Sequence, residues 1–92
     1  VQADLRNAAT AQETVLTNTG LYTTAIASLQ AAGFKYSGSE NYSANTAAID
    51  TSDVVAGQTY CMAAVSASGT TFQYSSPGGL KASTDAGYVA CT

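Results

Sequence analysis

The segment from Val1 to Asn18 restricts the fold more than any other, because its apolar and small residues repeat with the period of an α-helix. Gly20 follows the pattern and favours a helix end there, since glycine adopts the left-handed conformation at little steric cost. No capping residue precedes Val1, so we expect the helix to continue into a segment upstream of this chain. The residues on the apolar stripe, at the i, i+3, i+4 and i+7 spacing, are Leu5, Ala8, Ala9, Gln12, Val15 and Leu16.

Length and charge narrow the class of protein further. A chain of 92 residues supports one domain, whose core is marginal without a further restraint. Only 10% of the residues are charged and the net charge is −3, against about 25% charged residues in ordinary soluble domains. The three cations, Arg6, Lys35 and Lys81, are scattered, so this domain offers no basic stripe to a nucleic-acid backbone. An apolar run of about 18 residues is absent, so we predict no membrane-spanning segment within the sequence.

Residues 21–33 predict a turn and a short second helix. Thr23 or Thr24 would be its N-cap, and Gly33 would end it. The sequence then becomes rich in Ser, Asn, Gly and Ala and loses its periodicity, which predicts a loop with one weak strand within residues 42–49. We expect both segments to pack against the first helix.

The best hairpin in the chain runs from Gln58 to Ser75, where two β-prone runs flank a short turn. Residues 50–57 mix turn formers with two valines, and residues 76–92 read as a looped tail that opens with Pro77. A long amino-terminal helix packed on a small antiparallel sheet follows from these elements, which is the α+β class. The residues predicted to share one face of the first hairpin strand are Tyr60, Met62 and Ala64.

The only two cysteines, Cys61 and Cys91, are predicted to form a disulfide. Their spacing fits neither a C-x-x-C motif nor a zinc site, which would also need further Cys or His, and the sequence contains no His. Two reduced thiols in the core are the alternative. The disulfide is favoured because the domain is small and its tail has little core of its own, and it implies an oxidising compartment. Closing a loop of about 30 residues would contribute roughly 3 to 4 kcal/mol in the chain-entropy model.

The sequence gives little support to catalysis or metal binding. No Ser or Cys has a candidate general base, because His is absent and Lys35 and Lys81 lie in no S-x-x-K arrangement. Asp50 and Asp53, with Glu40 farther away, could supply oxygen ligands to Ca²⁺, but they lack the ligand number and spacing of an EF-hand. Turn capping by Asp is the favoured interpretation. We therefore predict no enzymatic activity, no metal and no cofactor.

A specific motif joins the first helix to the turn that follows it. In DLRNAATAQETVLTNTGLYTT, residues 4–24, a helix of the form L-R-N-A-x-T-A-Q-E runs into an N-x-G-x-Y-T-T turn. A variable loop, the hairpin TYCMAAVSASGTTFQYSS and a carboxyl-terminal loop closed by Cys91 follow it. In this motif and this order of parts, the chain resembles the globular part of a type IV pilin. The family's leader cleavage site, apolar amino-terminal helix half and glutamate near the mature start have no counterpart here, so the residues that drive its assembly cannot be transferred.

The resemblance implies a structural filament subunit rather than an enzyme, serving adhesion, surface motility or DNA uptake. Its partners would be copies of itself in a homopolymeric, extracellular filament on a bacterial cell surface. The missing helix half would anchor the subunit in the inner membrane before assembly. The loop between Cys61 and Cys91 would match the family's disulfide-bounded variable region.

The flank of the helix turned away from the sheet is the expected contact surface for neighbouring subunits. Its residues are Asp4, Asn7, Ala11 and Thr14. Two alternative functions remain open at this point. One is a pseudopilin of a type II secretion system, and the other is a small secreted, disulfide-bonded binding module.

Overall fold

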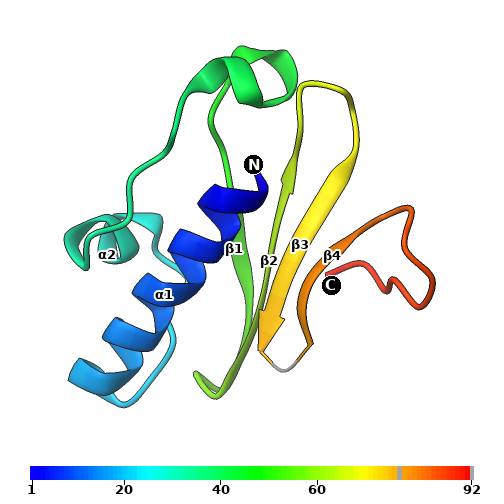
Figure 1. Cartoon of the computed structure of the whole chain (residues 1–92). Helices are drawn as coiled ribbons and strands as arrows, with labels where there is room; N and C mark the ends of the chain where they lie inside the picture. The colour runs from blue at the N-terminus through cyan, green and yellow to red at the C-terminus, as the bar shows by residue number, and fades with distance from the viewer. Residues whose placement is uncertain (77, 92) are drawn as a thin grey trace.

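One long helix and one four-stranded antiparallel sheet form the two main layers of the protein (Figure 1). The computed structural model describes residues 1–76 and 78–91, so Pro77 of the predicted tail lies outside the described residues. The strands lie in the sheet in the order of the sequence, and the predicted α+β class is confirmed. The elements are α1 (Gln2–Thr19), α2 (Ile26–Ala31), 3₁₀ turns at Ser39–Asn41 and Ser43–Asn45, β1 (Asp50–Val55), β2 (Thr59–Val65), β3 (Thr71–Ser76) and β4 (Gly79–Ala82).

Helix α1 forms where the apolar stripe predicts it and ends where the glycine predicts it. Gly20 has φ 83°, and its amide donates a hydrogen bond of 2.7 Å to the carbonyl oxygen of Leu16. This bond satisfies one of the last carbonyl groups of the helix. No helix in the described part of the chain combines the length and apolar character needed to cross a bilayer.

Helix α2 is shorter than predicted. It begins at Ile26 with Ala25 as its N-cap, so the prediction of a threonine cap is wrong. The Thr23 hydroxyl instead accepts a hydrogen bond of 3.1 Å from the amide of Ala25, before the helix starts. Gly33 has φ 109°, and the next amide, that of Phe34, donates to the carbonyl oxygen of Leu29 at 3.0 Å. The chain therefore reverses there and brings two buried side chains, Leu29 and Phe34, together.

The predicted hairpin is present as β2 and β3. Met62 lies opposite Tyr74, and Ala64 lies opposite Phe72. Alternate residues of β2 are buried, beginning with Tyr60, so one face of the strand points toward α1 as the pattern predicts.

Two strands and one irregular segment differ from the prediction. The segment predicted to contain a weak strand forms two 3₁₀ turns instead, and its one bridge joins Tyr42 to Ser66. Strand β1 begins only at Asp50 and carries an extra residue before Asp53. Asp50 stabilises this bulge, because its Oδ1 accepts hydrogen bonds from the amide and the hydroxyl of Ser52, at 2.9 and 2.6 Å. The tail, predicted as a loop, contributes β4 along β3.

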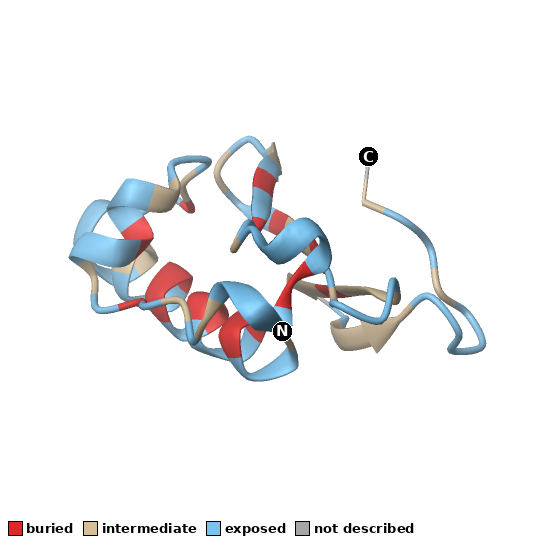
Figure 2. Ribbon diagram, turned by 90° about the horizontal axis from the view of Figure 1, so that it is seen from above, coloured by how far each residue is buried: buried red, intermediate tan, exposed pale blue. Residues whose placement is uncertain are grey.

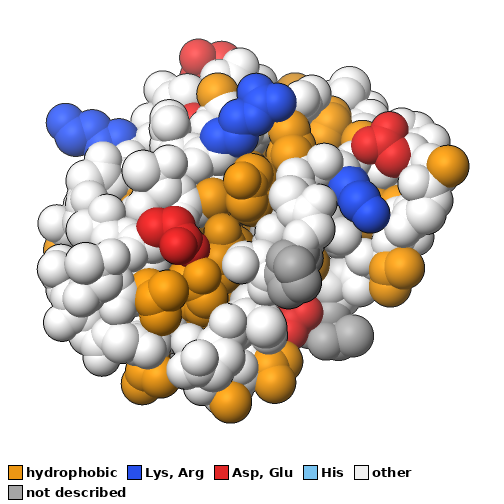
Figure 3. All heavy atoms as spheres, turned by 60° about the horizontal axis from the view of Figure 1, so that its bottom comes forward, with side chains coloured by type: hydrophobic (Ala, Val, Ile, Leu, Met, Phe, Trp, Pro, Cys, Tyr) orange, Lys and Arg blue, Asp and Glu red, His pale blue; other side chains and the backbone are white. Residues whose placement is uncertain are grey.

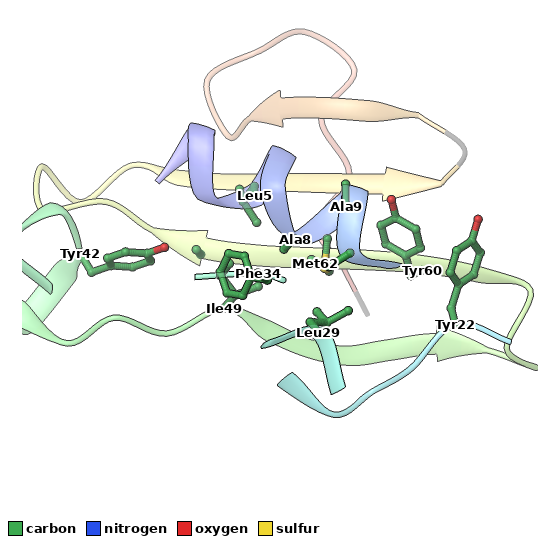
Figure 4. Close-up of a cluster of buried hydrophobic side chains, with 12 residues drawn as sticks. Leu5, Ala8, Ala9, Tyr22, Leu29, Phe34, Tyr42, Ile49, Tyr60 and Met62 are labelled. Carbon is green, nitrogen blue, oxygen red and sulfur yellow. The ribbon is translucent and has the colours of Figure 1, made fainter. Parts of the chain in front are cut away.

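The core lies between α1 and the sheet and is completed by α2 and residues 34–49. Leu5 and Ala8 of α1 are fully buried, as predicted, whereas Val15 and Leu16 are half-buried and pack against the core. Figure 4 shows Leu5, Ala8 and Ala9 alongside Met62 in the row of buried side chains. Figure 2 shows that the buried residues follow the inner side of α1 and the strands that face it, whereas the tail carries none. The other buried apolar residues are Ala11, Tyr22, Leu29, Phe34, Tyr42, Ile49, Tyr60 and Ala64.

Candidate functional site

The Cys61–Cys91 disulfide ties the end of the chain to the middle of the sheet. The two Cα atoms lie 5.6 Å apart across a sequence separation of 30 residues. The predicted pairing is confirmed, and the alternative of two reduced thiols is wrong. Cys61 alternates along β2 with Tyr60 and Met62, which face α1, so the disulfide stands on the opposite face of the sheet. We call this the outer face.

A buried glutamine gives the tail a second attachment on the outer face. Gln73 of β3 is only 5% exposed, although it points away from the core. Its Nε2 donates a hydrogen bond of 2.8 Å to the carbonyl oxygen of Val89, and its Oε1 lies 3.5 Å from Sγ of Cys91. The tail therefore covers this part of the sheet and supplies the partner that a buried amide requires. Gln73 was not predicted from the sequence as a buried residue, because an isolated Gln in a β-prone run is usually exposed.

Asp4, predicted as a subunit contact, is instead the centre of a buried hydrogen-bond network. Its exposed fraction is 2%. Its Oδ2 accepts hydrogen bonds from the hydroxyl of Tyr42 at 2.5 Å, the hydroxyl of Ser37 at 2.9 Å and the amide of Ser37 at 3.1 Å. These bonds fix the first turn of α1 to residues 37–42.

The ionised form of Asp4 is favoured by this network. Burial opposes ionisation, but the hydrogen bonds from Tyr42 and Ser37, with the positive amino group of Val1, outweigh it and hold the pKa of Asp4 below its usual value. Burial and the same hydrogen bond raise the pKa of the Tyr42 hydroxyl. At neutral pH the pair is therefore a carboxylate that accepts from a neutral phenol, which is a charge-assisted hydrogen bond.

The prediction that Asp4, Asn7, Ala11 and Thr14 share one exposed helix flank is wrong for two of the four. Ala11 is 3% exposed and Asp4 is also buried, whereas Asn7 and Thr14 are exposed. The reason is the segment after α2, which runs along this flank, bonds to Asp4 and places Phe34 beside Ala11. Nothing in the sequence of the helix itself indicates that a later segment returns to cover it.

One strip of the exposed side of α1 carries three threonines whose hydroxyl groups are already bonded to the helix. Thr10 donates to the carbonyl oxygen of Arg6 at 3.2 Å, Thr14 to that of Thr10 at 3.3 Å, and Thr17 to that of Glu13 at 2.9 Å. With its hydroxyl turned back to the preceding turn, each threonine presents its methyl group to the surroundings. The remaining members of this threonine face are Ala3 and Asn7, both exposed.

The opposite, buried side of α1 holds a second polar anchor, Gln12. The side chain is fully buried; its Nε2 donates to the carbonyl oxygen of Thr23 at 2.9 Å, and its Oε1 accepts from the amide of Thr23 at 3.0 Å. This pair of bonds holds the turn after α1 against the helix. The sequence placed Gln12 on the apolar stripe, and its burial is confirmed, but its partner was not predicted.

The carboxylates considered for Ca²⁺ serve different purposes. Asp50 caps its own turn, as favoured from the sequence, and bonds to Ser52 hold its pKa below the usual value. Within residues 1–76 and 78–91, the three potential metal ligands that lie together are Asp53, Cys61 and Cys91. The two sulfur atoms of that group are bonded to each other, so they cannot act as thiolate ligands in this form.

A furrow runs between α1 and the β3–β4 hairpin. It has a volume of about 370 Å³ and is lined by Arg6 and Glu13 of the helix and by Tyr60 and Tyr74 of the sheet. Figure 3, which looks at the end of the molecule opposite the 3₁₀ turns, shows a strip of hydrophobic side chains between charged groups of both signs. Burial raises the pKa of Tyr60, so its hydroxyl stays protonated. The helix side of the furrow thus carries one positive and one negative side chain, and the Glu13 carboxylate also accepts a hydrogen bond of 2.7 Å from the Tyr22 hydroxyl.

No family model matches the chain, and no curated protein matches it either.

Proposed function

We propose that this chain is the globular part of a filament subunit of the type IV pilin kind, without catalytic activity. The observation that carries the proposal is the threonine face of α1, defined by Ala3, Asn7, Thr10, Thr14 and Thr17. A long helix that packs one side on its own sheet and keeps a strip of small and β-branched side chains exposed is suited to helix-to-helix contact between copies of the chain.

The energetics of the threonine face support this use. Burying a hydroxyl group without a partner costs about 1 to 3 kcal/mol, but the hydroxyls of Thr10, Thr14 and Thr17 keep their intrahelical partners when a second helix covers them. Small and β-branched side chains also allow two helices to approach closely, since helix axes pack about 8 to 10 Å apart depending on the residues between them. The face can therefore enter an interface at low desolvation cost.

The position of the tail is consistent with the same arrangement. The tail lies on the outer face of the sheet, opposite α1, where Cys61 and Gln73 hold it. If copies associate through α1, the tail faces outward and is available for contacts with the surroundings. Adhesion, surface motility and DNA uptake all need such an outward surface, and the proposal does not distinguish among them.

The test introduces one charge into the threonine face in cells that make the full-length protein. Thr14→Arg places a long cation on the proposed contact, and Ser83→Arg places the same side chain on the exposed tail as a matched control. We expect filaments, measured as sheared high-mass material and by electron microscopy, to fall more than tenfold for Thr14→Arg and to be unchanged for Ser83→Arg. Both purified domains should unfold at the wild-type temperature, because both sites are exposed.

Two results would contradict the proposal. Equal assembly of the two variants would exclude the threonine face as the contact. Wild-type protein recovered only as a monomer in the medium would exclude a filament altogether and would favour a small secreted binding module.

A further inference from the structure

The disulfide of this protein is partly exposed and has a carboxylate beside it. Asp53 lies directly opposite Cys61 in the β1–β2 pair, so the two side chains stand on the same face of the sheet. A carboxylate oxygen of Asp53 and the sulfur atoms of Cys61 and Cys91 lie within 4.8 Å of one another, and all three residues are half-buried. We propose that Asp53 is an electrostatic shield that slows attack on the Cys61–Cys91 disulfide by anionic thiols.

The reaction that the shield opposes is thiol–disulfide exchange. A thiolate of the reagent attacks one protein sulfur, a mixed disulfide forms, the Cys61–Cys91 bond breaks, and its electron pair leaves on the other sulfur as a thiolate. A second thiolate attacks the mixed disulfide, which releases the oxidised reagent and the second protein thiolate. Both steps bring negative charge to the sulfur atoms beside Asp53, on the attacking group and on the leaving group. A fixed negative charge raises the energy of both transition states.

The size of the effect follows from distance and solvent exposure. Two unit charges at about 5 Å, partly screened by water, interact strongly enough to change a rate about three- to tenfold. Lys81 lies on the outer face as well, but it stands on β4 in register with Gln73, separated from β2 by β3. Two strand spacings, about 10 Å, separate Lys81 from Cys61. The Asp53 carboxylate lies within 4.8 Å of both sulfur atoms and is therefore the nearer charge to Cys61.

The inference is independent of the proposed filament role, because it concerns a reaction of the domain alone. The test measures the reduction rate of the purified protein at about pH 8 with two thiols of different charge. Glutathione is anionic as a thiolate, whereas in cysteamine an ammonium group balances the thiolate. We expect Asp53→Asn to be reduced about three- to tenfold faster than wild type by glutathione. The factor should be smaller with cysteamine, because repulsion of the leaving thiolate is the same for both reagents and only repulsion of the attacking anion differs. Glu40→Gln, an exposed carboxylate on a 3₁₀ turn, is the matched control and should change neither rate.

Two outcomes overturn the proposal. Equal acceleration by both thiols would mean that Asp53 does not repel the attacking anion, and no acceleration by glutathione would mean that the carboxylate does not act on the disulfide. A measurement on wild type alone guards against a folding defect of the variant. Raising the salt to about 1 M should speed reduction by glutathione more than reduction by cysteamine, and an absence of this difference would equally refute the shield.

Discussion

Replacing the buried carboxylate of Asp4 by an amide should remove a large share of the stability of this domain. In Asp4→Asn the acceptor of three hydrogen bonds loses its charge, and an NH₂ group that donates replaces one of its two oxygen atoms. A hydrogen bond to a charged group contributes about 1.5 to 3 kcal/mol and a neutral one about 0.5 to 1.5, so three exchanges amount to about 3 kcal/mol. The total stability of a small domain is only about 5 to 15 kcal/mol.

Thermal and urea unfolding, followed by circular dichroism, measure this loss. For a domain of this size, about 3 kcal/mol corresponds to a fall of at least about 10 °C in the midpoint temperature. Glu40→Gln makes the same chemical change at an exposed site and should alter the free energy of unfolding by less than about 0.5 kcal/mol.

The pH dependence of the free energy of unfolding distinguishes the effect of the charge of Asp4 from the effect of its packing. Because its folded-state pKa is depressed, its stabilising effect is complete above the unfolded-state value, about 3.9, and disappears as the pH falls through the folded-state pKa. The difference between wild type and Asp4→Asn should therefore be constant near neutrality and shrink below about pH 4. The pKa of Asp50 is also lowered, but Asp50 is present in both proteins, so its contribution to the pH dependence cancels in the difference between them. If the free energy of unfolding of Asp4→Asn is lower than that of wild type by less than about 0.5 kcal/mol, or if the difference stays constant down to pH 2, the carboxylate does not stabilise the domain in this way.

Three further substitutions test other contacts. Gln12→Leu leaves a backbone amide and carbonyl of the α1–α2 turn without their side-chain partner, so the free energy of unfolding should fall by about 2 to 3 kcal/mol in urea titrations. The double variant Cys61→Ser/Cys91→Ser should lose about 3 to 4 kcal/mol, and reduced wild type should unfold at the same urea concentration as this variant. Gly57→Ala should lower the unfolding temperature more than Gly20→Ala does. Both glycines have positive φ, but a Cβ at Gly57 would lie 2.6 Å from a leucine side chain, whereas a Cβ at Gly20 would meet no atom within 4 Å.

The elements that could be predicted from the sequence are those whose signal is local. The period of α1, its end at Gly20 and the alternation of β2 each depend on neighbouring residues and on the packing of one face. The disulfide could be predicted because only one pairing of Cys61 and Cys91 exists. The class of the fold followed from these parts.

The predictions that failed depend on contacts between segments distant in the sequence. Asp4 and Ala11 look exposed on a helical wheel, and only the path of the chain after α2 covers them. Strand β1 was missed because Asp50 and its bulge introduce turn-forming residues into a strand, and β4 because glycines precede its apolar residue Leu80. A carboxylate at the border of an apolar stripe, in the first turn of a helix, is the one local sign that could have marked Asp4 as a buried acceptor.

The core lies on one face of the sheet and the tail lies on the other. Residues can therefore be inserted into the tail without disturbing the core. Residues 83–88 contribute nothing to the core, and the tail residues that hold it to the sheet, Val89 through Gln73 and Cys91 through the disulfide, come after them in the chain. Lengthening a surface loop costs little, since each doubling of its length adds only about 0.6 kcal/mol of closure entropy. A peptide epitope inserted between Asp85 and Gly87 should therefore be presented at the surface while α1, the core and the disulfide stay as they are. Were the domain displayed along a filament, the same insertion would repeat in every copy.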